Sequence, residues 1–505
     1  MTFFRQPNLK QSDDVVTDAS VPQPDTKLTY SYPNSPLGKA RPIRVVVVGA
    51  GVSGIAAVKM FKDKFKNKPV ELVIYEKNHE VGGTWLENRY PGCACDVPAH
   101  AYSYSWEGNP NWSHAYVGSP ELFDWFQGRA KAYGVYDHTH FAHKVEKAVW
   151  DESQGQWELT VQDVTKKESF VTKAEVLINA AGFLSKWKWP DIKGLNSFKG
   201  HLAHSASWDS SYDFTGKRVA VIGSGSSGIQ IVPELQPIVK HLISFNRSPT
   251  WITPEFAAEF APEGRETAFS AQQKEQWSKN PKLYEEYRKS IESSMNRFFD
   301  MQYSDGESQK VAFQAMTQAM TDRLKTKPEL AKVLIPTFAF GCRRITPGHK
   351  YLESLIESNA TVEAQEILKI TETGLETLGG NKYEVDAIVC ATGFDTSYRP
   401  PFPLIGPDGK DLRDVWEEEP RSYLSIAASG FPNYFIIGGP NFPLANGALI
   451  PCLEKCIEYA YKAIDKIQTQ GVKAVYPKAE AVDDFQEHKD TLMKDLVWSS
   501  GCRSW

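Results

Sequence analysis

The sequence Arg44-Val-Val-Val-Val-Gly-Ala-Gly-Val-Ser-Gly-Ile-Ala-Ala57 decides the fold of this chain. Its four consecutive valines form a short, β-branched, apolar run, which is typical of a buried strand in a parallel sheet. Gly49, Gly51 and Gly54 follow the run at the spacing of a turn that joins a strand to a helix. The stretch therefore predicts the opening strand, turn and helix of an α/β nucleotide-binding domain.

The chemistry of this turn predicts what it binds. The first glycine permits a tight turn, the second lets backbone N–H groups approach a pyrophosphate, and the third lets the helix pack closely. Ser53 lies inside the turn, and the next predicted strand, Glu71–Tyr75, ends at Glu76. A carboxylate at that point accepts hydrogen bonds from ribose hydroxyls and repels a 2′-phosphate. The first site is therefore expected to bind FAD or NAD and not NADP, and we interpret it as the FAD site.

The same pattern recurs after the predicted strand Arg218–Ile222. The second strand of this copy ends not in an acid but in Arg247 and Ser248, which suit a 2′-phosphate. The second site is therefore expected to bind NADPH. Two alternatives stay open: Arg247 in a surface ion pair, and a glycine turn that is an empty loop. The residues of the second turn are Gly223, Ser224, Gly225, Ser226, Ser227 and Gly228.

Two such units predict an α/β protein with two Rossmann-like dinucleotide-binding domains, each a three-layer ββα arrangement. An antiparallel meander is expected over residues 141–178, and a charged stretch with helical periodicity interrupts the NADP domain. The predicted order is an N-terminal arm (1–40), the first part of the FAD domain (41–190), the NADP domain (191–251 and 333–382) with a helical insertion (252–332), and the second part of the FAD domain (383–505).

Composition excludes several classes of protein. With 41% hydrophobic and 24% charged residues in 505, the chain can bury a large core. A net charge of −5 provides no general attraction for nucleic acid or anionic lipid, so neither partner is expected. No secretory signal or membrane-spanning segment is evident. The seven cysteines form no CxxC pair, so we expect neither a disulfide framework nor a metal site. This use of cysteine favours a cytoplasmic location.

Two longer motifs make the prediction more specific. The stretch from Phe198 to Asp209 fits the pattern FxGxxxHxxxW(P/D), with Gly200, His204 and Trp208 at its fixed positions. Residues 82–96 fit (A/G)GxWxxxx(F/Y)P(G/M)xxxD, through Gly83, Thr84, Trp85, Tyr90 and Asp96. In both motifs and in their order, the chain resembles Baeyer–Villiger monooxygenases, the class B flavin monooxygenases, and looks closest to fungal members.

The resemblance implies an enzyme that uses FAD, NADPH and O₂ to convert a small-molecule ketone into an ester or lactone through a C4a-peroxyflavin. It implies that Arg344 is the active-site arginine and that Asp96 lies beside the isoalloxazine and holds that arginine. A structural Asp–Arg bridge is the alternative. Arg343 matches a basic residue facing the NADP phosphate, and Trp505 a tryptophan on the loop that closes over NADP.

Further positions follow from the same resemblance. Trp85 and Tyr102 are expected near the flavin and Val145 at the adenine end, whereas His204 and Trp208 are expected to position the domains. We expect the ketone pocket to be lined by the helical insertion, the region after Asp96 and residues 440–450. Oxygenation of amines or thioethers and a non-catalytic FAD/NADP-binding protein remain as alternatives. A redox role for Cys93 and Cys95 also competes with a structural one.

Overall fold

The computed structural model describes residues 36, 38–443 and 447–502. The first predicted strand lies at the centre of a five-stranded parallel sheet. In it β1 (Ile43–Val48) pairs with β2 (Val70–Tyr75) on one side and with β7 (Val176–Asn179) on the other. The outer strands are β3 (Thr139–His140) and β19 (Tyr434–Ile436). The centre of β1 is fully buried because other layers cover both faces of the sheet.

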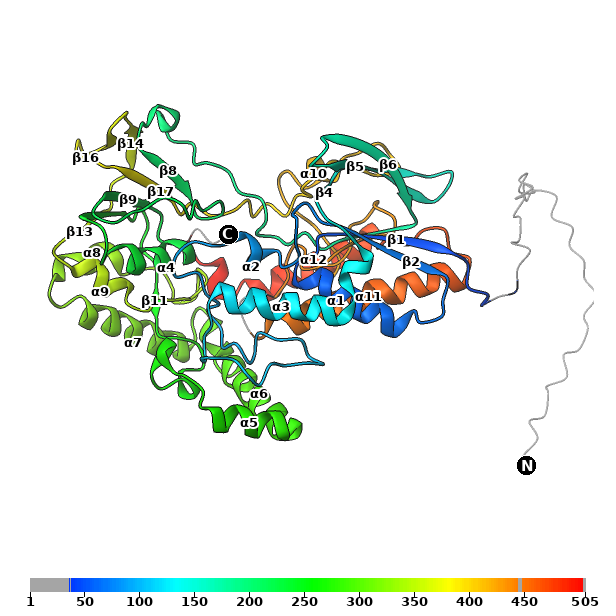
Figure 1. The fold of residues 1–505 in the computed structure, drawn as a ribbon, viewed down its shortest axis with the longest axis horizontal. Helices are drawn as coiled ribbons and strands as arrows, with labels where there is room; N and C mark the ends of the chain where they lie inside the picture. The colour runs from blue at the N-terminus through cyan, green and yellow to red at the C-terminus, as the bar shows by residue number, and fades with distance from the viewer. Residues whose placement is uncertain (1–35, 37, 444–446, 503–505) are drawn as a thin grey trace, which may run out of the picture.

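The first domain has three layers, as predicted, and apolar side chains fill the space on both faces of its central sheet (Figure 1). On one face lie the helices α1 (Val52–Lys64), α3 (Ser119–Tyr133) and α11 (Leu449–Thr469). On the other face lies a four-stranded sheet in which the predicted meander forms three strands. These strands are β4 (His143–Asp151), β5 (Gln156–Asp163) and β6 (Glu168–Ala174), with β18 (Leu404–Ile405) parallel to β4.

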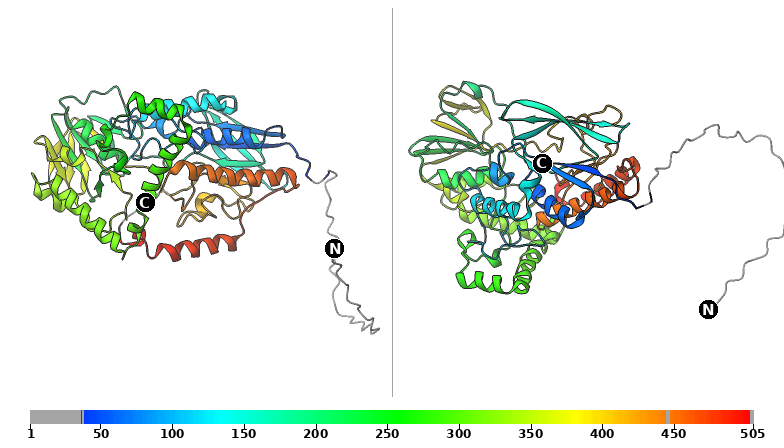
Figure 2. Two further views of the ribbon diagram at one scale, coloured as in Figure 1. Left: turned by 90° about the horizontal axis from the view of Figure 1, so that it is seen from below. Right: turned by 45° about the vertical axis from the view of Figure 1, so that its right-hand side comes forward.

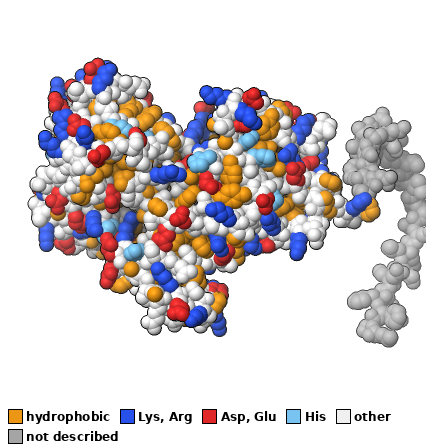
Figure 3. Space-filling view, viewed as in Figure 1, with side chains coloured by type: hydrophobic (Ala, Val, Ile, Leu, Met, Phe, Trp, Pro, Cys, Tyr) orange, Lys and Arg blue, Asp and Glu red, His pale blue; other side chains and the backbone are white. Residues whose placement is uncertain are grey.

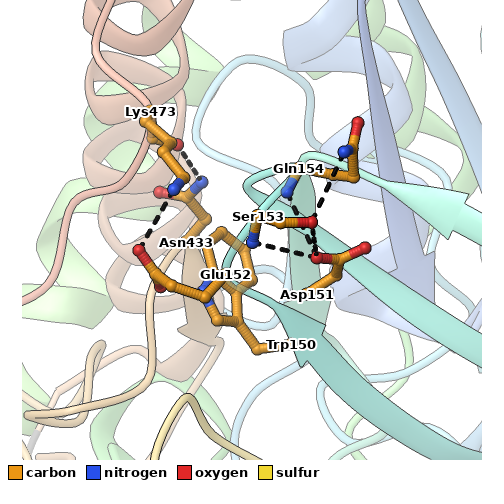
Figure 4. Close-up of polar contacts among 7 residues, drawn as sticks. All are labelled: Trp150, Asp151, Glu152, Ser153, Gln154, Asn433 and Lys473. Atoms are coloured by element: carbon orange, nitrogen blue, oxygen red, sulfur yellow. Dashed lines mark hydrogen bonds and ion pairs between the residues drawn. The ribbon is translucent and has the colours of Figure 1, made fainter.

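The meander is fastened to the segment that follows α11 (Figure 4). Lys473 Nζ lies 3.1 Å from Glu152 Oε1 in the β4–β5 turn. Asn433 Nδ2 donates to the carbonyl oxygen of Lys473 at 3.0 Å, and the Val475 N–H donates to Asn433 Oδ1 at 2.8 Å. The Asn433 bonds hold Lys473 beside the β4–β5 turn, which follows the strand that carries Val145.

The second sheet repeats the first. β9 (Arg218–Ile222) pairs in parallel with β10 (His241–Phe245) and β17 (Ala387–Cys390), and β13 (Ala360–Glu363) and β8 (His201–His204) are the outer strands. One face carries α4 (Ser226–Leu235) and α9 (Tyr351–Ile356), and the other carries the antiparallel strands β14 (Ile367–Ile370), β15 (Gly374–Thr377) and β16 (Lys382–Glu384).

One predicted domain boundary is wrong. Residues from 383 onward were assigned to the FAD domain, but β17 pairs with β9 and β8 in the second sheet. Its four buried residues suit the centre of either parallel sheet equally well, so the sequence of the strand does not reveal its partner. The chain returns toward the first sheet only after Cys390.

The predicted insertion is helical and projects from the second domain (Figure 2). It contains α5 (Ala271–Lys279), α6 (Pro281–Asn296) and α7 (Glu307–Arg323). No helix among the described residues is long and apolar enough to cross a membrane. Shorter elements and a C-terminal helix complete the fold: α2 (Thr84–Glu87), β11 (Ile252–Thr253), α8 (Ala331–Leu334), β12 (Thr346–Pro347), α10 (Leu412–Val415) and α12 (Ala479–Met493).

Candidate active site

A cleft of about 1030 Å³ connects the two glycine turns. This volume is at the upper end of the usual range for small-molecule sites. The surface is visibly hollowed between the lobe of the second sheet and the lobe of the meander (Figure 3). Residues of both domains and of the helical insertion line the cleft. It therefore has room for more than one ligand between the domains.

Two glycines of the first turn, Gly49 and Gly54, have no room for a side chain. Gly49 has φ 101°, and a Cβ there would lie 2.8 Å from the carbonyl oxygen of Ala180. A Cβ on Gly54 would lie 2.2 Å from the carbonyl oxygen of Gly49. Gly51 and Ser53 line the cleft at the start of α1, where backbone N–H groups and the helix dipole favour an anion.

Glu76 lies at the end of β2, as predicted, and its carboxylate is buried. It accepts hydrogen bonds from the N–H groups of Ala50 at 2.7 Å and Asn78 at 2.8 Å. Burial raises the pKa of Glu76 above its ordinary value, although these two bonds oppose the shift. Glu76 also lines the cleft, where its remaining acceptor capacity fits the hydroxyls of a ribose.

The second turn repeats this geometry. Gly223 has φ 112°, and a Cβ on Gly228 would lie 2.1 Å from the Gly223 carbonyl oxygen. At Gly225 a Cβ would meet nothing within 4 Å, so the space in front of this turn is open. Gly225 lines the cleft together with Ser224, Ser226 and Ser227, at the start of α4.

Two arginines near the second turn have no carboxylate partner among the described residues. Arg247 is exposed and stands outside the cleft lining, as does Ser248, whose carbonyl oxygen accepts a bond from Ser224 Oγ at 3.3 Å. Arg343 lines the cleft and lies over the ring of Phe338 at 5.1 Å. Burial, and secondarily the charge of Arg247, lowers the pKa of Arg343. Arg343 Nη1 donates to the carbonyl oxygen of Pro249 at 3.4 Å, and among the described residues neither arginine forms an ion pair with a carboxylate, so the two fit an incoming phosphate.

Arg344 and Asp96 meet in the cleft as predicted. Arg344 Nη2 donates to Asp96 Oδ2 at 2.6 Å. The side chain of Arg344 is 32% exposed, and it is part of the cleft wall. The charge of Asp96 raises the pKa of Arg344, so the guanidinium stays protonated. A fixed cation thus lies between the two glycine turns.

The remaining predicted flavin contacts also line the cleft: Gly83, Thr84, Trp85, Tyr102 and Val145. The rings of Trp85 and Tyr102 meet edge to face with centroids 5.6 Å apart. The indole Nε1 of Trp85 is buried and has no hydrogen-bond partner among the described residues.

The residues of the long fingerprint are not part of the cleft lining. His204 is buried, its ring stacks on Trp187 at 4.4 Å, and its Nε2 lies 3.2 Å from Thr392 Oγ1. Burial lowers the pKa of His204 to about 4, so its ring is neutral at pH 7. Trp187, which does line the cleft, belongs to one connection between the domains, and Thr392 belongs to the other.

Other fingerprint residues have local packing roles. A Cβ on Gly200 would lie 2.5 Å from the ring of Phe198, and Trp208 stacks on Phe214 at 5.3 Å. Asp209 accepts the N–H of Ser211 at 2.9 Å within its own turn. The fingerprint therefore shapes the second domain and its connections, and none of its five residues is in the cleft lining.

Apolar side chains from the insertion and from α11 are part of the cleft lining. They are Phe256, Met295 of α6, and Leu449 and Leu453 of α11. The three regions predicted for the ketone pocket, which are the insertion, the residues after Asp96 and residues 440–450, each contribute residues to the cleft, and which of them contact a ketone stays a prediction. Other lining residues were not predicted: Lys77, Asn78, Lys144, Gln230 and Thr250. Trp505 lies outside the described residues.

The sequence predicts no disulfide framework, but the described residues contain one disulfide that was not predicted. Cys342 and Cys502 are bonded, although 160 residues separate them in the sequence. Neither spacing nor an odd total of cysteines could reveal this pair, because only the fold brings the two together. Cys93 and Cys95 are free and buried, and burial raises their pKa values to about 11 and about 12. Thiols of this kind react slowly.

Comparison with known proteins agrees with this geometry. Residues 42–264 match the flavin-binding monooxygenase-like family. The chain is 41% identical to FAD-binding monooxygenase tazF of Aspergillus terreus over 92% of this chain and 82% of that protein. It is 32% identical to a Baeyer–Villiger monooxygenase of Pseudomonas aeruginosa over 92% of this chain and 85% of that protein.

A solved structure is similar to this chain over most of the length of both proteins. Cyclohexanone monooxygenase from Rhodococcus sp. Phi1, bound to NADP⁺, superposes with a TM-score of 0.79 at 26% sequence identity. The superposition covers 91% of each chain.

Proposed function

Since this chain belongs to the Baeyer–Villiger-type flavin monooxygenase family, we propose that it is an NADPH-dependent enzyme that inserts one oxygen atom of O₂ beside a ketone carbonyl. The products are an ester or lactone and water. The observation that carries the proposal is the Arg344–Asp96 pair, held between two dinucleotide turns that open into one cleft.

The first turn, Glu76 and Trp85 would hold FAD, and the second turn with Arg247 and Arg343 would hold NADPH. When bound and reduced, the flavin supplies the activation of O₂. The chain's own contribution is a permanent cation at Arg344 that stabilises negative charge developing on the reacting oxygen atoms. Asp96 fixes the orientation of that cation by a charge-assisted hydrogen bond.

The apolar side chains of the cleft lining suit the body of a ketone. Phe256, Met295, Leu449 and Leu453 offer no charged group, so binding there excludes water from the reacting atoms. The proposal therefore places the carbonyl toward Arg344 and the hydrocarbon part of the substrate toward these four side chains.

The test is product analysis. The purified protein, NADPH and air are mixed with a panel of cyclic and linear ketones, an amine and a thioether, and the products are identified by mass spectrometry. We expect an ester or lactone that is one oxygen atom heavier than its ketone. If only the amine or the thioether were oxidised, the function would be N- or S-oxygenation and not ketone oxidation. Absence of any NADPH consumption would overturn an enzymatic role.

Replacing Arg247 with alanine should weaken NADPH selectively. A charge-assisted bond to a 2′-phosphate contributes about 1.5–3 kcal/mol, so KM for NADPH should rise by roughly 10- to 150-fold. KM for NADH should change little, because NADH lacks that phosphate. Steady-state kinetics with both cofactors measure the ratio. The matched control is Arg421→Ala, which removes an arginine from a surface pair with Asp483. An unchanged preference for NADPH in R247A would contradict the assignment.

A further inference from the structure

Arg344 is carried by a segment without regular secondary structure, residues 336–345, which we call the arginine loop. Such a segment lacks the hydrogen bonds of a helix or strand, so its rigidity depends on individual contacts. Catalytic stabilisation of charge demands a cation fixed in place before the reaction begins. What holds this loop therefore bears directly on the proposed chemistry.

One side of the loop is held by the helical insertion. Gln309 of α7 is 4% exposed and pairs reciprocally with the backbone of Phe340. Its Nε2 donates to the Phe340 carbonyl oxygen at 2.8 Å, and the Phe340 N–H donates to its Oε1 at 3.0 Å. This pair fixes the loop four residues before Arg344.

The other side is held covalently by Cys342, which is 1% exposed and lies two residues before Arg344. Its disulfide partner, Cys502, belongs to the C-terminal segment, where Ser500 Oγ also lies 3.3 Å from Cys342 Sγ. That segment is itself anchored to the insertion: the Ser304 N–H donates to the Asp495 carbonyl oxygen at 2.8 Å, and Val497 is fully buried.

We propose that the Cys342–Cys502 disulfide is a positioning element for Arg344, so that opening it lowers the share of NADPH oxidation that ends in oxygen transfer. The proposal rests on the proposed function for the role of Arg344. A loop fixed at Phe340 and Cys342 presents the guanidinium to Asp96 in one arrangement. With the crosslink open, only the noncovalent contacts of Cys342 remain on that side.

Formation of the bond needs an oxidant. The two thiols give up two electrons and two protons as the S–S bond forms. Hydrogen peroxide accepts them and becomes two molecules of water. A flavin monooxygenase makes hydrogen peroxide itself whenever it reduces O₂ without transferring oxygen to a substrate. A phosphine reductant reverses the bond by taking up one oxygen atom from water as it releases both thiols.

The experiment compares Cys342→Ser, Cys502→Ser, the double variant and wild type as holoenzymes, with and without tris(2-carboxyethyl)phosphine. The control is Cys452→Ser, which removes a free thiol on α11. Peptide mapping without reduction should find a peptide that joins residues 342 and 502. Deuterium exchange in residues 336–345 should be faster in all three crosslink variants and in reduced wild type. Product formed per NADPH should fall by about tenfold, within the roughly 100-fold that a misplacement of about 1 Å can cost.

The pattern across variants decides the proposal. The two single variants and the double variant should behave alike, and the phosphine should not change them further, because each lacks the same bond. Three results would overturn the proposal. They are a peptide map without the joined peptide, a C502S variant with the deuterium exchange and the product per NADPH of wild type, and effects of the two substitutions that add in the double variant. If wild type oxygenates no ketone, the proposed function fails instead. The rate of deuterium exchange in residues 336–345 then decides whether the crosslink positions the loop.

Discussion

Replacing Arg344 with alanine should abolish ester formation while the protein still binds FAD and oxidises NADPH. The substitution removes the cation beside the reacting oxygen atoms, and loss of one such group typically costs 10²- to 10³-fold in rate. Electrons from NADPH should then end in hydrogen peroxide. The measurement is the ratio of ester to hydrogen peroxide at equal NADPH consumption.

Companion variants separate chemistry from folding. Removing Arg344 leaves Asp96 without its 2.6 Å partner, which destabilises the cleft wall. The double variant Asp96→Asn with Arg344→Ala removes the unpaired charge and should recover thermal stability but not ester formation. Arg344→Lys keeps a positive charge without the planar fork and should keep part of the activity. Normal ester formation by R344A would refute the role that we assign to the arginine.

Alanine at Gly54 and alanine at Gly228 should eliminate different cofactors. At each position a Cβ would lie 2.2 Å or less from a backbone carbonyl oxygen, so the glycine turn itself must shift. G54A should purify without the yellow colour of bound FAD. G228A should purify yellow, but its flavin should not be reduced by NADPH. Absorbance of the purified protein and anaerobic reduction measure the two effects.

Gly128→Ala is the matched control for both glycine variants. Gly128 lies inside α3 with open space around it, and alanine favours a helix by about 1 kcal/mol over glycine. The control should therefore bind FAD and NADPH normally and melt at the wild-type temperature or above. Loss of FAD from both G54A and G228A would contradict the assignment of one cofactor to each turn.

Local signals predicted the frame of the site. A buried β-branched run followed by closely spaced glycines determines strand, turn and helix within a few residues, so both turns and Glu76 occur where expected. Asp96 is predicted as a fixed position of a spaced motif and Arg344 through the resemblance to the family, because nothing local distinguishes either from other charged residues. Their direct contact supports that reading.

Features that depend on contacts between distant parts of the chain could not be predicted from the sequence. The four apolar residues of β17 fit either sheet, so their partner β9 appears only in the fold. Cys342 and Cys502 carry no sequence signal of their proximity. Arg247 was predicted as a cofactor contact, yet its side chain is exposed outside the cleft lining, where only a bound phosphate would test it. Met295 lies in a charged helix whose register toward the cleft is set by the packing of the insertion.

The insertion contributes to two properties that are usually considered separately. Met295 on α6 borders the proposed ketone pocket, and Gln309 on α7 clamps the arginine loop. Transplanting the insertion from a homologue to broaden substrate scope would thus also alter the clamp on the loop. Directed evolution of this lobe should accordingly produce variants in which a gain in range accompanies wasted reductant, unless residues 309 and 340 are kept as a matched set.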